Sequence, residues 1–248
     1  MAGTDSAGVP WEGRHFEHGA SSDDDGSAPE KLIEALHRFR AHDLGEADVV
    51  DALRDSRLLI PLVAELGSEG RTEHGHDKSQ ELSIVTVAGP DGRTVLPAFT
   101  SVDAMSRWNG LARPVPATAG RVALAAASED TDLVVLDPTS DTEFVIRRPA
   151  LWALAQSQPW TPSYADPGVL SAFMDAAEPE LAVAAVRLAP GDPGSRLAGP
   201  ELVVQLSLAP GLDQPALDGV LARLQERWGA SDVIAARVDS MRVVLTSD

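Results

Sequence analysis

The amino-acid sequence predicts an α+β fold in two parts, and three observations support this prediction. The chain has 248 residues, of which 44% are hydrophobic, enough for one large core or two small ones. Apolar residues at helical spacing alternate with short runs rich in valine, isoleucine and leucine. Several of these runs follow one another through short turns, as antiparallel strands do. We therefore expect an N-terminal mixed or antiparallel sheet with several helices, followed by a smaller β-β-α-β-β domain.

Composition divides the chain into four segments. Residues 1–28 are polar and acidic, and we expect them to be disordered because they have too little apolar surface to bury. Residues 29–165 form the predicted N-terminal domain. Residues 166–178 follow a stretch rich in proline and other turn-forming residues and are predicted to be a linker. Residues 179–248 form the second domain.

The first predicted elements are two helices and a strand. Residues 27–30 (Ser-Ala-Pro-Glu) have the spacing of a capping box, so Ser27 is predicted to cap a helix that starts beside them. A second helix is expected at 46–55, and a strand at 57–64. Because Pro61 cannot donate a backbone hydrogen bond, we expect that strand to lie at a sheet edge or to contain a bulge.

The strongest local signal is a hairpin predicted over 82–99. Two alternating β-rich runs flank a Pro-Asp-Gly turn at 90–92. The hydroxyls of Thr100 and Ser101 are then placed to cap a helix that includes Trp108.

In the rest of the N-terminal domain, we predict an extended segment at 113–116 and a helix at 118–127. Two paired strands are then predicted at 133–136 and 143–147, and a final helix from Pro149 onward. The second domain is predicted to contain four strands, over 181–188, 201–208, 232–237 and 241–246. Its one helix follows the second strand, with Asp213 as the N-cap.

Charge and composition exclude several classes of function. The chain has 38 acidic and 20 basic residues, which gives a net charge of −18. Such a chain is a poor ligand for nucleic acid or anionic lipid, which attract clustered lysine and arginine. The chain contains no cysteine, which excludes persulfide and cysteine-nucleophile chemistry. We find no secretory signal and no apolar run long enough to span a membrane, so we expect a cytoplasmic protein.

Several motifs, taken in order, resemble the SseB (enhanced serine sensitivity) family. They are the run at 82–86, Pro-Ala-Phe-Thr-Ser at 97–101, Trp108, Arg-Pro-Val-Pro at 113–116, and the strand and Asp-Pro turn at 133–138. Residues 149–164 resemble actinobacterial members, and residues 207–213 and 237–240 are similar to the family's C-terminal domain. The resemblance implies a two-domain cytoplasmic α+β protein of no established enzymatic activity.

The distribution of histidine argues against catalysis. All six histidines precede residue 77, so the predicted hairpin and the whole second domain have no histidine acid or base of their own. A metal site could be built from His74 and His76 with their acidic neighbours, or from His15 and His18. These residues lie in segments predicted to be mobile, where ligands lack support, so we expect no metal and no cofactor.

Five residues are candidates for an interaction or ligand surface: Thr100, Ser101, Trp108, Asp137 and Arg147. Thr100 and Ser101 are more readily explained as helix caps than as nucleophiles. Trp108 would mark an interface if it were exposed. Arg147 could hold an acidic ligand beside the Asp137 turn, although the favoured interpretation places its side chain outward on an edge strand.

We predict that the protein is not an enzyme but a protein-interaction or regulatory adaptor with an unknown protein partner. The alternative is a sensor that binds an amino-acid-like metabolite between the hairpin at 82–99 and the Asp137 turn. A polar pocket there would favour the sensor, and a flat apolar patch would favour the adaptor.

Overall fold

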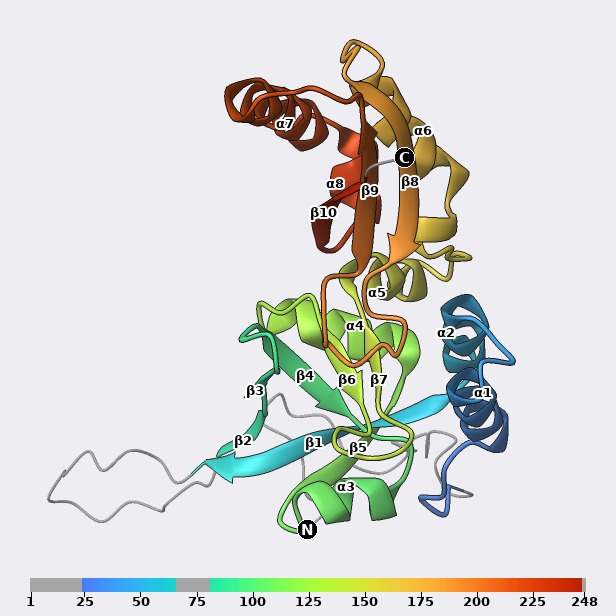
Figure 1. Cartoon of the computed structure of the whole chain (residues 1–248). Helices are drawn as coiled ribbons and strands as arrows, with labels where there is room; N and C mark the ends of the chain where they lie inside the picture. The colour runs from blue at the N-terminus through green and yellow to red at the C-terminus, as the bar shows by residue number, and fades with distance from the viewer. Residues whose placement is uncertain (1–23, 66–80, 247–248) are drawn as a thin grey trace, which may run out of the picture.

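The computed structural model describes residues 24–65 and 81–246, and its architecture is α+β, as predicted. Figure 1 shows two lobes that meet at a narrow waist. We call residues 24–155 the N-terminal half and residues 163–246 the C-terminal half. The expectations for residues 1–23 and the loop 66–80, including His15, His18, His74 and His76, lie outside the described residues.

The N-terminal half contains five helices and seven strands in its described part. The helices are α1 (Glu30–Arg40), α2 (Glu46–Arg54), α3 (Val102–Trp108), α4 (Ala119–Ser128) and α5 (Arg148–Ala155). The strands are β1 (Arg57–Glu65), β2 (Glu81–Ile84), β3 (Val87–Ala88), β4 (Thr94–Ala98), β5 (Arg113–Thr118), β6 (Val134–Leu136) and β7 (Phe144–Ile146). They form two sheets, of order β2-β1-β5 and β3-β4-β6-β7, which touch where Leu59 pairs with Phe99.

Within the second sheet, β4 and β6 run parallel and β7 pairs antiparallel with β6. The predicted pairing of the strands near 133–136 and 143–147 is therefore confirmed. The strands β6 and β7 are buried along their whole length. Helices cover one face of the sheet, and Leu197 from the C-terminal half packs with Val135 and Val145 on the other. Leu36 and Leu53, from α1 and α2, pack in the same core as Leu136 and Phe144.

The predicted hairpin over 82–99 forms only in part. Val87 and Ala88 pair with β4 across the Pro-Asp-Gly turn, whereas β2 pairs with β1 in the other sheet. The apolar run over 82–88 contributes one strand to each sheet, and the chain passes from the first sheet to the second at residues 85–86.

The prediction that Pro61 lies at an edge or in a bulge is wrong, because β1 is the central strand of its sheet. The amide of Leu59 donates to the carbonyl of Phe99, away from β5. Alternation along the strand gives the nitrogen of Pro61 the same side. The nitrogen of Pro61 lies between the Leu59–Phe99 contact and Leu62, where the pairing with β2 begins, so the missing N–H costs no hydrogen bond between strands.

The predicted capping box at 27–30 is also wrong. Pro29 is the N-cap of α1, without a side-chain cap, and the amide of Ser27 donates instead to the carboxylate of Asp25. Proline supplies a fixed φ there, and Glu30 in the first turn suits the helix dipole.

The C-terminal half consists of a three-stranded sheet with helices on one face. Its elements are the short 3₁₀ turn η1 (Ser163–Ala165), α6 (Pro167–Ala177), β8 (Val183–Pro190), β9 (Leu202–Leu208), α7 (Gln214–Gly229), α8 (Asp232–Arg237) and β10 (Met241–Thr246). The strand order is β10-β9-β8, with β10 parallel to β9. Asp213 caps α7, as predicted.

Two predictions for this half require correction. The segment 166–178, expected to be a linker, contains α6, whose Val169 and Phe173 are fully buried against α7 and the sheet. The segment 232–237, expected to be a strand, is the helix α8, because Ser231 accepts a hydrogen bond from the amide of Ile234 and caps it. The order is therefore α-β-β-α-α-β rather than β-β-α-β-β.

Candidate functional site

The candidate site lies where two parallel strands end. Because β4 and β6 are parallel, their carboxyl ends lie at the same edge of the sheet, and the residues that follow them come together there. Thr100 follows β4 and Asp137 follows β6. In sheets with parallel strands, ligands bind characteristically outside such ends.

The carboxylate of Asp137 joins the two strand ends. Its Oδ1 accepts the backbone amide of Thr100 at 2.8 Å, and its Oδ2 accepts the hydroxyls of Thr100 at 2.7 Å and of Thr142 at 2.9 Å. Asp137 is 1% exposed. Thr100, predicted to be a helix cap, therefore bonds to Asp137 instead, and Ser101 alone caps α3 by accepting the amide of Ala104.

The backbone of the turn after β6 holds this carboxylate in place. Asp137 and Thr139 have φ values of 45° and 67°, in the left-handed region that aspartate tolerates better than most residues. The carbonyl of Asp137 accepts both the amide and the hydroxyl of Ser140. The loop 137–142 is thus a compact turn built on its own polar groups.

Burial raises the pKa of Asp137 above the ordinary value of an aspartate. The hydrogen bonds from Thr100 and Thr142 and the charge of Arg107 act in the opposite direction but do not offset the loss of hydration.

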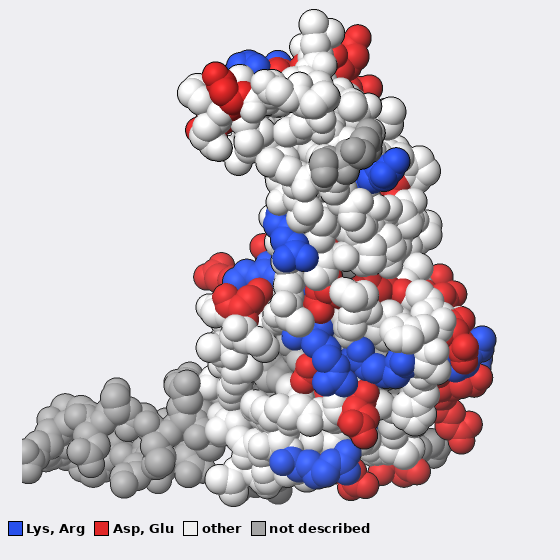
Figure 2. Space-filling view, viewed as in Figure 1, with Lys and Arg blue, Asp and Glu red and all other residues white. Residues whose placement is uncertain are grey.

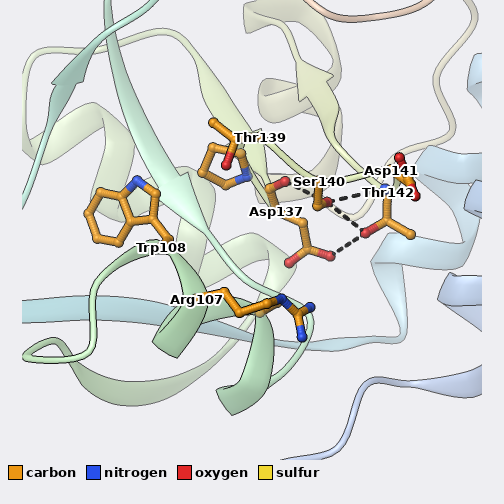
Figure 3. A pocket seen from close by; sticks show the side chains of 9 residues that line it. Arg107, Trp108, Asp137, Thr139, Ser140, Asp141 and Thr142 are labelled. Atoms are coloured by element: carbon orange, nitrogen blue, oxygen red, sulfur yellow. Dashed lines mark hydrogen bonds between the residues drawn. The ribbon is translucent and has the colours of Figure 1, made fainter.

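A hollow of about 470 Å³ opens beside this turn. It is bounded by α3 on one side and by the loop 137–142 on the other, and its lining residues are Ala104, Arg107, Trp108, Asp137, Pro138, Thr139, Ser140, Asp141 and Thr142. Figure 3 shows the guanidinium of Arg107 beside the carboxylate of Asp137, with Trp108 at the far end of the hollow. The hollow thus offers hydroxyls, a cation and an aromatic ring to a small ligand.

The two α3 side chains are positioned differently. Trp108 is half-buried, and its ring packs against that of Phe99 with centroids 5.3 Å apart. Arg107 is exposed. Among the described residues, no carboxylate lies within ion-pair distance of Arg107.

A second hollow adjoins the first around the start of α3. It shares Arg107, Asp137 and Thr142 with the first and adds Thr100, Ser101 and His37 to the lining. Four of the five predicted candidates, Thr100, Ser101, Trp108 and Asp137, therefore lie around one polar depression.

Arg147 does not lie in the site, and the expectation that it points outward is wrong. It is 7% exposed, and its guanidinium contacts Asp192 at 2.8 Å and Asp239 at 3.1 Å, both in the C-terminal half. It also donates to the carbonyl of Gly199 and the hydroxyl of Ser240. Arg147 thus bonds the two halves together.

Sequence reasoning missed Arg107 and the hydroxyls of Thr139, Ser140 and Thr142. A signal was present, since Thr-Ser-Asp-Thr at 139–142 follows directly on the Asp-Pro turn and Arg107 precedes the selected tryptophan. Neither segment points to a site until the parallel pairing of β4 with β6 is known.

Two further findings concern metals and membranes. Within residues 24–65 and 81–246, no group of three or more histidine, aspartate or glutamate side chains is arranged to hold a metal ion. In the same part of the chain, no helix has the length and apolar character needed to cross a membrane.

The fold and the site define an α+β protein with a polar surface hollow at the ends of two parallel strands. Residues 32–153 match the family model described as the SseB protein N-terminal domain, a segment that contains every residue lining the first hollow. The chain therefore belongs to the SseB family, as its motifs indicated. Comparisons with curated proteins and with solved structures gave no match.

Proposed function

We propose that this SseB-family protein is a non-enzymatic sensor that binds a small, amino-acid-like molecule in the hollow between α3 and the loop 137–142. The observation that carries the proposal is the lining of that hollow, where Arg107 is exposed beside a wall of hydroxyls. A guanidinium binds a carboxylate through paired, charge-assisted hydrogen bonds. Arg107 thus takes the role that the sequence suggested for Arg147, and α3 takes the place of the predicted hairpin as one wall.

The same contacts argue against catalysis. The hydroxyls of Thr100 and Thr142 donate to Asp137, and that of Ser140 donates to the carbonyl of Asp137. A nucleophilic hydroxyl needs both a base beside it and access to the substrate. The Thr100 hydroxyl lies beside Asp137 but belongs to a residue only 2% exposed, and the carbonyl that accepts from Ser140 is not a base. The polar groups of the site are therefore suited to recognition.

Thermal unfolding of the full chain with a panel of amino acids and other small carboxylates tests the proposal. A ligand that binds only the folded state raises the free energy of unfolding, by about 2.7 kcal/mol when its concentration is a hundred times Kd, and this raises the unfolding midpoint. We expect at least one amino acid to raise the midpoint of the wild type and to have no effect on Arg107→Ala.

The matched control is Arg121→Ala, which removes an exposed arginine of α4 and should respond to the ligand as the wild type does. If no member of the panel shifts the wild-type midpoint, the sensor proposal fails.

A protein-interaction role is the second candidate, and a different part of the molecule favours it. Met241, Val244 and Leu245 of β10 are 37%, 37% and 43% exposed, so a single strand presents three large apolar side chains to solvent. Met241 and Leu245 lie on the same face of the strand, and contiguous exposed apolar side chains mark contacts with other proteins.

A further inference from the structure

The outer edge of β10 has the features of an acceptor for one more strand. β10 lies at the end of the order β10-β9-β8 and pairs only with β9 among the described strands. It is six residues long and contains no proline, and its one charged residue is Arg242. Proteins usually protect long apolar edges with prolines, bulges or several charges, none of which is present here.

The hydrogen-bonding groups on that edge follow from the register. The amide of Leu202 donates to the carbonyl of Ser240, and Met241 is the residue directly opposite Leu202. In a parallel ladder, the residue after such an acceptor directs both its amide and its carbonyl to the other side. Met241, Val243 and Leu245 therefore present three amides and three carbonyls outward, with the repeat that an extended backbone matches.

The helical layer extends further than the sheet it covers. The 16 residues of α7 make a helix about 24 Å long, whereas the outer strands of a three-stranded sheet lie about 10 Å apart. α7 buries Val220 and Leu224 against the sheet and reaches past β10 in Figure 1. Its Leu217 and Leu221 are only half-buried. A fourth strand would lie beneath this part of the helix.

The surroundings of the edge favour a slim partner. Figure 2 shows that the outline of the molecule is indented between α7 and the N-terminal half, where β10 lies in Figure 1. A second folded copy would bring its own two lobes to that indentation, whereas a single extended segment needs only the width of a strand. Arg242 is exposed, and among the described residues no carboxylate pairs with it.

We propose that β10 binds an extended peptide segment of a partner protein by strand addition, with apolar side chains toward α7 and an acidic residue opposite Arg242. Main-chain hydrogen bonds would supply affinity and the alternating side chains specificity, as in other cases of strand addition. This inference gives the interaction role its surface and does not depend on ligand binding at the Asp137 hollow.

The test is selection of a displayed library of random dodecapeptides on the full-length protein, followed by binding measurements with the enriched peptides. We expect enriched sequences to alternate apolar residues and to contain an acid. Val243→Pro removes the central outward amide while leaving the bonds to β9, and should weaken binding about tenfold or more. Val243→Thr keeps that amide and is the matched control.

Two further variants separate the possible outcomes. Arg242→Glu should reverse the preference for an acidic over a lysine-containing version of the same peptide. Arg107→Ala should bind peptide as the wild type does, so failure here and failure of the sensor proposal are distinguishable. The proposal is overturned if no peptides are enriched, if they bind Val243→Pro unchanged, or if sedimentation shows a wild-type dimer that Val243→Pro dissociates.

Discussion

The side chain of Asp137, just after β6, bonds to Thr100, which lies 37 residues earlier in the sequence, just after β4. Its carboxylate accepts three hydrogen bonds although it is almost completely buried. The loop 137–142 forms a wall of the hollow, so the shape of the hollow depends on this one residue. An aspartate here is a structural residue that also shapes the site.

Replacing Asp137 by alanine should lower the free energy of unfolding by about 1–3 kcal/mol, because Thr100 and Thr142 would keep buried polar groups without their acceptor. Asp141→Ala, in the same loop but exposed, should change it by about 0.5 kcal/mol or less. Chemical denaturation of both variants checks this. Equal losses would contradict the role of Asp137.

The raised pKa of Asp137 predicts how stability depends on pH. The carboxyl of Asp137 keeps its proton to a higher pH in the folded state than in the unfolded chain. Between the ordinary aspartate pKa and the raised pKa of Asp137, the folded state therefore binds more protons than the unfolded state. Stability should therefore fall as the pH rises through that interval. In Asp137→Asn this part of the decline should be absent, as denaturation curves at several pH values would show. An unchanged decline would assign it to other carboxyls.

At the scale of elements, the short helix α3 carries Arg107 and Trp108 into the site and depends on Ser101 for its start. Ser101→Ala removes the oxygen that accepts the amide of Ala104 and should cost about 1 kcal/mol of stability. Ser106→Ala, at an exposed position inside the same helix, lacks this effect because alanine favours helix interiors. Thermal unfolding distinguishes the two, and a similar loss in both would argue against the cap.

Elements with strong local signals could be predicted from the sequence, and their partners could not. The parallel pairing of β4 with β6 and the division of 82–99 between two sheets are set by long-range contacts that leave no local pattern. Residues 232–237 contain the β-branched pair Val233 and Ile234, which favoured a strand, yet the Ser231 cap makes a helix. Because long-range contacts leave no local pattern, Asp137, Thr100 and Trp108 could be selected individually from the sequence, but the bond between Asp137 and Thr100 could not be predicted.

At the scale of the whole molecule, buried ion pairs join the halves. Asp239 contacts both Arg147 and Arg93, and Asp192 contacts Arg147 while accepting the amides of Arg196 and Leu197. The side chains of Asp192 and Asp239 are each 3% exposed. Removing Arg147 would leave the buried carboxylate of Asp192 without a cation and that of Asp239 with Arg93 alone.

We therefore expect Arg147→Ala to lower the free energy of unfolding by about 3–5 kcal/mol. Arg147→Lys keeps the charge but not the forked geometry, and should lose less. The surface variant Arg121→Ala should stay within about 0.5 kcal/mol of the wild type. Urea titrations of the three variants give these values. A loss below about 1 kcal/mol for Arg147→Ala would show that the ion pairs of Arg147 contribute little to stability.

The loop that follows β8 has a consequence for any attempt to study the matched family domain by itself. The backbone carbonyl of Ser195 in this loop accepts the amide of Val145 at the outer edge of β7, and the side chain of Arg196 donates to the carbonyl of Ser140. A fragment ending near residue 160 would lose both hydrogen bonds, leaving the outer edge of β7 unpaired and the rim of the hollow beside Asp137 unsupported. In a test of the proposed sensor role, a truncated protein would therefore bind more weakly for reasons unrelated to Arg107.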